Sequence, residues 1–293
     1  MELELWPACV KAHGFAEQLR AAASAGFDSL SIGPATYKAL RRSGLAARHV
    51  AAMAADHGVR LGHYDGFSDW APVRCGASLP AAAREVFDVS CEDCLAACSE
   101  LGLPSICATA AFAPGEVELA AMIDAFGAFC ERARAAGVRV DLEFIPMWGI
   151  PDLRTAWGIV GAVGASNAGV LLDTWHFFRG APELELLQSL PPDSITAVQL
   201  ADAPRVLRGA DLLEDCLRYR LPPGEGELAL DAVLRTIRDK GGVASIGPEV
   251  FSDALDELDA EQAARLVAAS TRRVLADAQF EPDRGRARAT GRT

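Results

Sequence analysis

Residues 137–176, GVRVDLEFIPMWGIPDLRTAWGIVGAVGASNAGVLLDTWH, decide the fold because they contain one complete strand–helix–strand unit. Two nearly continuous apolar runs, 138–144 and 168–174, are typical of parallel strands that are buried on both faces. Residues 152–163 between them predict a helix, which begins after Pro151 because proline suits a first helical turn. Gly137 precedes the first strand, where a glycine is well suited to ending the previous helix.

The same unit recurs along the whole chain. Predicted strands cover residues 2–5, 27–32, 59–63, 105–108, 138–144, 168–174, 195–201 and 243–250. Predicted helices cover residues 16–25, 44–58, 81–101, 116–136, 152–163, 182–190, 228–242 and 260–278. Eight alternations of strand and helix predict an α/β fold, a (β/α)8 or TIM barrel, as a single domain over residues 1–280. A doubly wound open sheet is the alternative, but eight is the strand number of the barrel.

Two segments lie outside these units. Residues 203–227 follow the seventh strand and are much longer than the about 2–6 residues usual in such a connection, which predicts a lid or binding loop. In a barrel this lid lies at the carboxyl ends of the strands, where active sites of the fold are found. Residues 281–293 contain four arginines and are expected to be a mobile tail.

Charge and composition exclude several classes of protein. The 293 residues include 28 Lys and Arg against 40 Asp and Glu, a formal net charge of −12, so nucleic-acid binding is not expected. The chain has no apolar run of about 18 residues, and MELELWPACV carries acids where a signal peptide needs bases. We therefore expect a cytoplasmic protein without a membrane contact. Cys91, Cys94 and Cys98 are interpreted as small buried residues of a helix rather than as a zinc or redox motif.

Oxygen ligands stand at the ends of the last four predicted strands: Glu143, Asp173, Gln199 and Glu249. A carboxylate in an apolar strand is costly unless it is paired or bound to a metal ion. Since the carboxyl ends of all barrel strands meet at one face, these side chains are expected to converge there. Such an all-oxygen set suits one hard divalent cation, Mn²⁺ or Mg²⁺, with Co²⁺ also compatible. The alternatives are buried salt bridges for the acids and a core amide for Gln199.

The motifs around these residues resemble the xylose-isomerase-like TIM-barrel family, often called the sugar phosphate isomerase/epimerase family. The matching segments are DLEF with Glu143, LLDTWH with Asp173, VQLADAPR with Gln199 and GPEVF with Glu249. VQLADAPR and the later PPGEGEL are most similar to the hydroxypyruvate isomerase branch. The resemblance covers about residues 138–251, and it implies that these four residues hold one divalent metal ion.

The resemblance also implies an activity. The metal ion would chelate a carbonyl oxygen and the neighbouring hydroxyl oxygen, and Glu143 and Glu249 would move a proton by way of an enediolate. His176 would hold a substrate oxygen, and Arg205 would bind the substrate. Return of the proton to another carbon or another face gives an isomerase or epimerase of a small hydroxy-carbonyl, sugar-like substrate, which is the first expectation. The alternative is a lyase: a 3-dehydroshikimate or keto-inositol dehydratase, or an enzyme of C-glycoside β-elimination.

Further residues are expected at the mouth of the barrel. Trp6, His63 and Trp148 follow strands and are expected to line the substrate. Met147 and Trp148 stand where many family members have an Asn that helps to bind substrate. No glycine-rich phosphate loop follows strand seven or eight, so a phosphorylated substrate is not expected.

Two other classes of protein fit the sequence less well. A nuclease like endonuclease IV would need a histidine-rich site and a basic surface, whereas the chain has five histidines and a negative net charge. A metal-free binding module is disfavoured by the four oxygen ligands. The expected partner is a small sugar-like or cyclic hydroxy-carbonyl substrate, and a homodimer is compatible with the fold.

Overall fold

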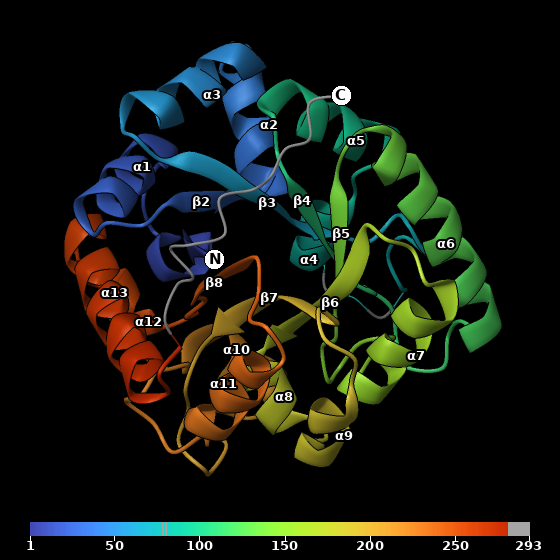
Figure 1. Cartoon of the computed structure of the whole chain (residues 1–293). Coiled ribbons are helices and arrows are strands. Elements are labelled where there is room, and N and C mark those ends of the chain that lie inside the picture. Colours follow the sequence, from blue (N-terminus) through green and yellow to red (C-terminus); the bar gives the residue numbers. More distant parts are fainter. Residues whose placement is uncertain (78, 80, 281–293) are drawn as a thin grey trace, which may run out of the picture.

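Eight parallel strands close into a barrel in the order β1 to β8 in this computed structural model, which describes residues 1–77, 79 and 81–280. Figure 1 shows the helices arranged around the strands. The strands are β1 (Glu2–Leu5), β2 (Ser29–Ile32), β3 (Arg60–Phe67), β4 (Ser105–Ala108), β5 (Arg139–Glu143), β6 (Ala168–Asp173), β7 (Ile195–Leu200) and β8 (Ser245–Pro248). The predicted TIM barrel is therefore confirmed.

The helices surround the barrel and bury apolar side chains against its strands. They are η1 (Pro7–Val10), α1 (Phe15–Ser24), α2 (Pro34–Arg42), α3 (Ala47–Asp56), α4 (Ala81–Phe87), α5 (Cys91–Leu101), α6 (Leu119–Ala135), α7 (Leu153–Val163), α8 (Thr174–Arg179), α9 (Leu184–Ser189), α10 (Leu212–Arg218), α11 (Leu230–Asp239), α12 (Asp253–Asp256) and α13 (Ala260–Asp277). The last helix, α13, packs against α1, so the two ends of the barrel sequence lie side by side (Figure 1).

Some predicted elements differ from the observed ones. The single helix predicted over residues 81–101 is wrong: α4 and α5 are separate because Ser90 begins α5, its Oγ accepting a hydrogen bond of 3.1 Å from the Asp93 amide. The helices η1, α2, α8, α10 and α12 were not predicted. Strand β3 runs to Phe67, four residues beyond its predicted end at His63, which brings Asp65 into the strand.

The barrel interior contains a buried charged layer. Nδ1 of His63 lies 2.9 Å from Oε2 of Glu4, and Nε2 lies 2.8 Å from Oδ2 of Asp141. Burial alone would lower the pKa of His63, but Glu4 and Asp141 outweigh it and raise this pKa to about 10. His63 is therefore an imidazolium held between two carboxylates. Gly62 is required beside it, because a Cβ at that position would collide with the Glu4 carboxylate.

The predictions for the cysteines, for membrane contact and for the tail have different outcomes. The cysteines are free thiols, and Cys91, Cys94 and Cys98 are buried along α5, as predicted. Among the helices of the described residues, none has the length and apolar character needed to cross a membrane. The predicted mobile tail, residues 281–293, lies outside the described residues.

Candidate active site

The lid segment, residues 203–227, is anchored at the carboxyl end of the barrel by two buried aspartates. Asp202 accepts hydrogen bonds of 3.0 Å from the amides of Gly224 and Leu228, which fixes the end of the lid. Asp215, in α10, accepts a hydrogen bond of 3.0 Å from Nε1 of Trp175. The lid therefore lies over the strand ends as part of the folded barrel.

The four predicted metal ligands all lie at this end of the barrel. Glu143 ends β5, Asp173 ends β6, Gln199 lies in β7 opposite Asp173, and Glu249 follows β8. All four residues are buried, with at most 5% of the residue surface exposed. Nε2 of Gln199 donates a hydrogen bond of 3.1 Å to Oε1 of Glu249. We call these four residues the acid–amide ring.

His176 adds a nitrogen to the ring. It lies in the first turn of α8, where Oδ1 of Asp173 caps the helix by accepting a hydrogen bond of 2.8 Å from the His176 amide. Glu143, Asp173 and His176 each offer one ligand atom within 4.8 Å of the others. Burial lowers the pKa of His176 to about 3, so its imidazole is neutral and can accept a hydrogen bond or bind a metal ion.

Arg220 was missed by the sequence analysis and lies in the middle of the site. Its Nη1 donates to Oδ2 of Asp173 at 2.6 Å and lies 3.4 Å from Oε2 of Glu249. The guanidinium is held between the rings of Trp175 and Phe251, whose centroids are 5.1 and 5.0 Å from Cζ. Arg220 belongs to the lid segment, so the lid brings a fixed positive charge to the ring.

Asp65 and Cys107 were missed as well. Sγ of Cys107 donates a hydrogen bond of 3.3 Å to Oε2 of Glu143. Burial, together with other carboxylates of the barrel, raises the pKa of Asp65 to about 6. Asp65 stands in HYDGF, directly after the predicted strand 59–63, so a longer strand would have brought it to the barrel.

The electrostatics of the ring favour a bound cation. Burial raises the pKa of Glu143 and of Glu249 well above the usual value, and the nearby Asp65 raises both further. Burial would also raise the pKa of Asp173, but Arg220 and His176 hold it below its usual value. Crowded carboxylates of this kind retain protons unless a positive charge takes their place.

Gln199 supplies a direct test of whether a metal ion fits. Its Oε1 is buried and has no hydrogen-bond donor among the described residues, although Nε2 is paired with Glu249. A buried amide oxygen without a donor is costly, and a divalent cation would satisfy it. Three carboxylates, this amide oxygen and a neutral imidazole are a suitable donor set for such a cation.

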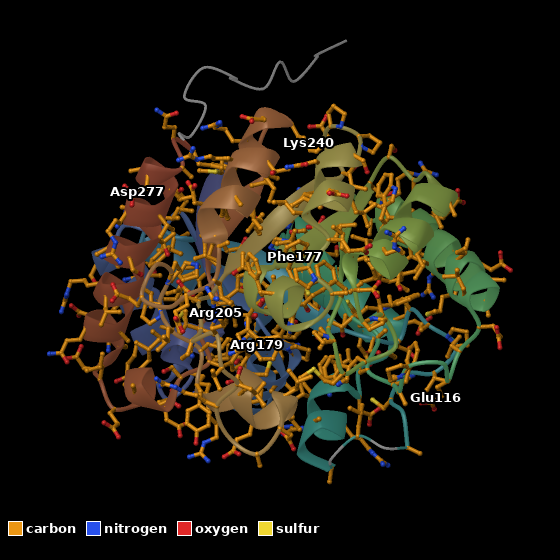
Figure 2. The ribbon with its side chains drawn as sticks, turned by 90° about the horizontal axis from the view of Figure 1, so that it is seen from below. Glu116, Phe177, Arg179, Arg205, Lys240 and Asp277 are labelled. Atoms are coloured by element: carbon orange, nitrogen blue, oxygen red, sulfur yellow. The ribbon has the colours of Figure 1, made fainter. Side chains whose placement is uncertain are left out.

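The predicted substrate-binding residues are distributed unevenly. Arg205 is exposed, its amide donates to Glu227, and its carbonyl oxygen accepts from Arg179, which lies beside it (Figure 2). The structure thus does not bring the Arg205 side chain to the ring. Both ring nitrogens of His63 already face carboxylates, so they are not free for a substrate.

Two predicted aromatic residues lie in different surroundings. Trp6 is completely buried, with its ring 5.6 Å from that of His63. Trp148 is partly buried and contacts Phe87 edge to face, with 5.1 Å between ring centroids. The substrate roles of both residues stay predictions.

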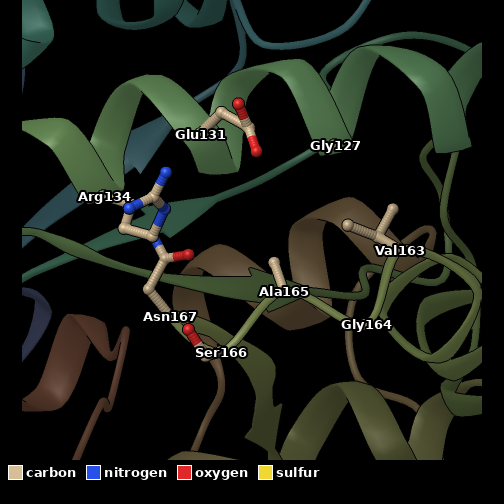
Figure 3. A pocket seen from close by; sticks show the side chains of 8 residues that line it. All are labelled: Gly127, Glu131, Arg134, Val163, Gly164, Ala165, Ser166 and Asn167. Carbon is tan, nitrogen blue, oxygen red and sulfur yellow. The ribbon is translucent and has the colours of Figure 1, made fainter.

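A separate hollow of about 420 Å³ lies at the other end of the barrel wall (Figure 3). It is lined by Gly127, Glu131 and Arg134 of α6 and by residues 163–167, which precede β6. Because it adjoins the amino end of β6, it is remote from the acid–amide ring at the carboxyl ends. It therefore does not belong to the candidate active site.

A comparison against protein families agrees with the closed barrel. The chain belongs to the xylose isomerase-like TIM barrel family, whose model matches residues 19–273.

Two kinds of curated relative are similar in sequence. The 3-dehydroshikimate dehydratase of Pseudomonas aeruginosa is 31% identical over 245 residues, which cover 81% of this chain but 36% of that protein. The inosose isomerase of Halalkalibacterium halodurans is 32% identical over 135 residues, 45% of this chain and 46% of the relative. The chain therefore spans only about a third of the length of that dehydratase.

Solved structures share the fold. The IolI protein with a bound zinc atom superposes with a TM-score of 0.80 at 19% identity, covering 94% of this chain and 99% of that one. A xylose isomerase-like TIM barrel/4-hydroxyphenylpyruvate dioxygenase fusion protein has a TM-score of 0.78 at 23% identity, covering 97% of this chain and 45% of the fusion.

Proposed function

We propose that the chain is a divalent-metal-dependent dehydratase of a cyclic hydroxy-ketone that carries a carboxylate, in the class of 3-dehydroshikimate. The observation that carries this proposal is Arg220, a buried guanidinium within hydrogen-bonding reach of the acid–amide ring. Its N–H groups already reach Asp173, Glu249 and Cys216, so it would favour a substrate carboxylate through its positive charge rather than through free donors. The dehydratase of Pseudomonas aeruginosa, which covers 81% of this chain, supports the same class.

The ring residues would hold the cation. Glu143, Asp173, Gln199 and Glu249 supply three carboxylates and one amide oxygen, and His176 lies close enough to add a nitrogen. A divalent cation bound there would polarise the substrate carbonyl and so acidify the adjacent C–H bond. Mn²⁺, Mg²⁺ and Co²⁺ suit the oxygen ligands, and the bound zinc of the IolI protein makes Zn²⁺ a fourth ion to test.

Glu143 and Glu249 would carry the protons. One carboxylate removes the proton from the carbon next to the carbonyl, and the electron pair of that C–H bond forms the new double bond. The hydroxyl on the next carbon then leaves as water, taking a proton from the other carboxyl group. The raised pKa values of both residues suit groups that must hold a proton and pass it on.

Charge balance supports an acidic substrate. Arg220 and a divalent cation together balance the three carboxylates of the ring, so the ring itself carries no excess negative charge that would repel an anion. Dehydration of a ring that already contains one double bond also has a strong driving force when it makes the ring aromatic. From 3-dehydroshikimate, loss of water followed by a keto–enol shift, which moves a proton from the remaining ring CH2 group to the carbonyl oxygen, would give a dihydroxybenzoate.

The second candidate is an isomerase or epimerase of an uncharged cyclic or open sugar-like ketone. This reaction would use the same acid–amide ring and the same first proton transfer. The proton would then return to carbon, and no water would leave. The inosose isomerase of Halalkalibacterium halodurans, 32% identical over 135 residues, favours this candidate. A solved L-ribulose 3-epimerase with the same fold, at 18% identity and a TM-score of 0.67, is compatible with it.

The mass of the product separates the two candidates. Purified protein is freed of metal with a chelator, reloaded in turn with Mg²⁺, Mn²⁺, Co²⁺ or Zn²⁺, and incubated with 3-dehydroshikimate and with inosose. We expect 3-dehydroshikimate to give a product lighter by one water, with the ultraviolet absorbance of an aromatic acid. A product of unchanged mass from inosose alone would favour the isomerase, and turnover of neither compound with any ion would contradict both.

A further inference from the structure

Three buried polar atoms at the carboxyl end of the barrel have no hydrogen-bond partner among the described residues: Oε1 of Gln199, Nδ1 of His176 and Nε1 of Trp6. The side chains are 0, 3 and 0% exposed. Gln199 belongs to the candidate metal site, which gives its free Oε1 a purpose. His176 faces Glu143 of that site with Nε2, at 3.6 Å, and not with its free Nδ1. The indole N–H of Trp6 has no such explanation, because it can only donate a hydrogen bond and cannot bind a cation.

Strand register places Trp6 beside Glu249. In the pairing of β1 with β8, Glu2 lies opposite Ser245 and Leu3 opposite Ile246. Continued to the strand ends, this register puts Trp6 opposite Glu249, and the Trp6 amide donates a hydrogen bond of 3.3 Å to the Pro248 carbonyl. Side chains alternate along a strand, so Trp6 lies on the same side of the sheet as Glu4, one layer nearer the ring.

No acceptor is available to Trp6 in the layer below. The neighbouring aromatic ring is that of His63, whose two nitrogens both donate to carboxylates and whose charged ring has no acceptor. The protein does satisfy its other buried indoles. Nε1 of Trp70 donates to the Thr109 carbonyl at 2.6 Å, and Nε1 of Trp175 donates to Asp215 at 3.0 Å. Trp6 is thus an exception at the site itself.

We propose that the indole N–H of Trp6 donates a hydrogen bond to an oxygen of the bound substrate. This contact would select substrates that carry an oxygen atom at the position next to Glu249. The acceptor is a hydroxyl, keto or carboxylate oxygen. This inference rests on the proposed function only in that a hydroxy-carbonyl compound binds at the acid–amide ring. An analogue with CH2 at that position would leave the indole unpaired in a buried site and would be rejected.

Nuclear magnetic resonance of the indole N–H tests the contact directly. Protein labelled with ¹⁵N at tryptophan gives one indole cross-peak per Trp, and the peak lost in Trp6→Phe identifies Trp6. The Mg²⁺-loaded protein is titrated with dihydroxybenzoate and separately with inosose. We expect the Trp6 peak to move downfield when either compound binds, while the peak of Trp157, on the outer helix α7, stays in place.

Kinetics provide the second readout. Trp6→Phe keeps the aromatic ring and removes only the N–H, so we expect kcat/KM to fall about ten- to hundredfold. Mg²⁺ affinity, measured by calorimetry, should not change, which separates this role from a role in the metal site. Trp157→Phe is the matched control and should retain wild-type kinetics.

The outcomes separate this inference from the proposed function. A shifted Trp6 peak without turnover of 3-dehydroshikimate supports the inference and counts against the dehydratase alone. Turnover by a Trp6→Phe enzyme at the wild-type kcat/KM overturns the inference and leaves the proposed function intact. A Trp6 peak that stays in place under all titrations also overturns it.

Discussion

Nη1 of Arg220 lies 2.6 Å from Oδ2 of Asp173, and both side chains are fully buried. One partner comes from the lid segment and the other from the end of β6. The pair therefore connects the lid to the acid–amide ring. It also explains why the pKa of Asp173 is held down, whereas burial and Asp65 raise those of Glu143 and Glu249.

Replacement of Arg220 tests whether the charge of this guanidinium favours an anionic substrate. We expect Arg220→Gln to lower kcat/KM for an anionic substrate by at least about thirtyfold, the lower end of the effect of truncating a buried charged pair. Arg220→Lys keeps the charge but loses the fork geometry and the stacking between Trp175 and Phe251, and should rescue only part of the activity.

Arg205→Gln is the matched control, because Arg205 is exposed in the same lid segment. It should leave kcat/KM within about twofold of the wild type, as expected for an exposed side chain. Equal losses in the Arg205 and Arg220 variants would return the substrate role to Arg205. Steady-state kinetics and a thermal melt of each variant provide the comparison.

Gln199 should act as a metal ligand through Oε1. We expect Gln199→Leu to weaken Mn²⁺ binding by more than about 100-fold, beyond the range for a residue that only supports a ligand. Gln199→His should keep most of the affinity, because an imidazole nitrogen can take the place of the amide oxygen. Calorimetric titration with Mn²⁺ measures both, and unchanged affinity in Gln199→Leu would contradict the role.

Glu143 and Glu249 are expected to differ in the proton step they serve. Each Glu→Gln change removes a proton acceptor while leaving a carbonyl oxygen for the metal ion, so kcat should fall about 10²–10⁴-fold with modest loss of metal affinity. Exchange of substrate hydrogen with solvent deuterium distinguishes the two. The variant that loses exchange identifies the base, and wild-type turnover in either variant would remove that residue from the mechanism.

The acid–amide ring could be predicted from sequence because its members stand at strand ends, and the barrel fixes where strand ends meet. Arg220 could not be predicted, since it lies in a lid segment of about 25 residues whose path is decided by tertiary contacts such as those of Asp215 and Asp202. Asp65 was not recognised because the end of β3 was predicted four residues too early.

The charged interior layer could be predicted only in part. Asp141 stands two residues before Glu143 in VRVDLEF, so strand alternation places both on one side. Nothing in the sequence shows that Glu4 and His63, on two other strands, supply its partners. His63 was instead expected at the substrate, because the true end of β3 was not recognised.

The imidazolium of His63 should make the stability of the fold depend on pH. Its pKa is raised from 6.5 to about 10, so the folded state binds a proton that the unfolded state releases above pH 6.5. The stabilisation is therefore complete below about pH 6.5 and is lost as pH rises towards 10. We expect the difference in unfolding free energy between wild type and His63→Gln to shrink over this range, by at most ~1.4 kcal/mol per pH unit. Urea denaturation of Mg²⁺-loaded protein at several pH values measures it, with the exposed His57→Gln as control. A difference that stays constant or grows with pH would show that His63 is neutral in the folded protein.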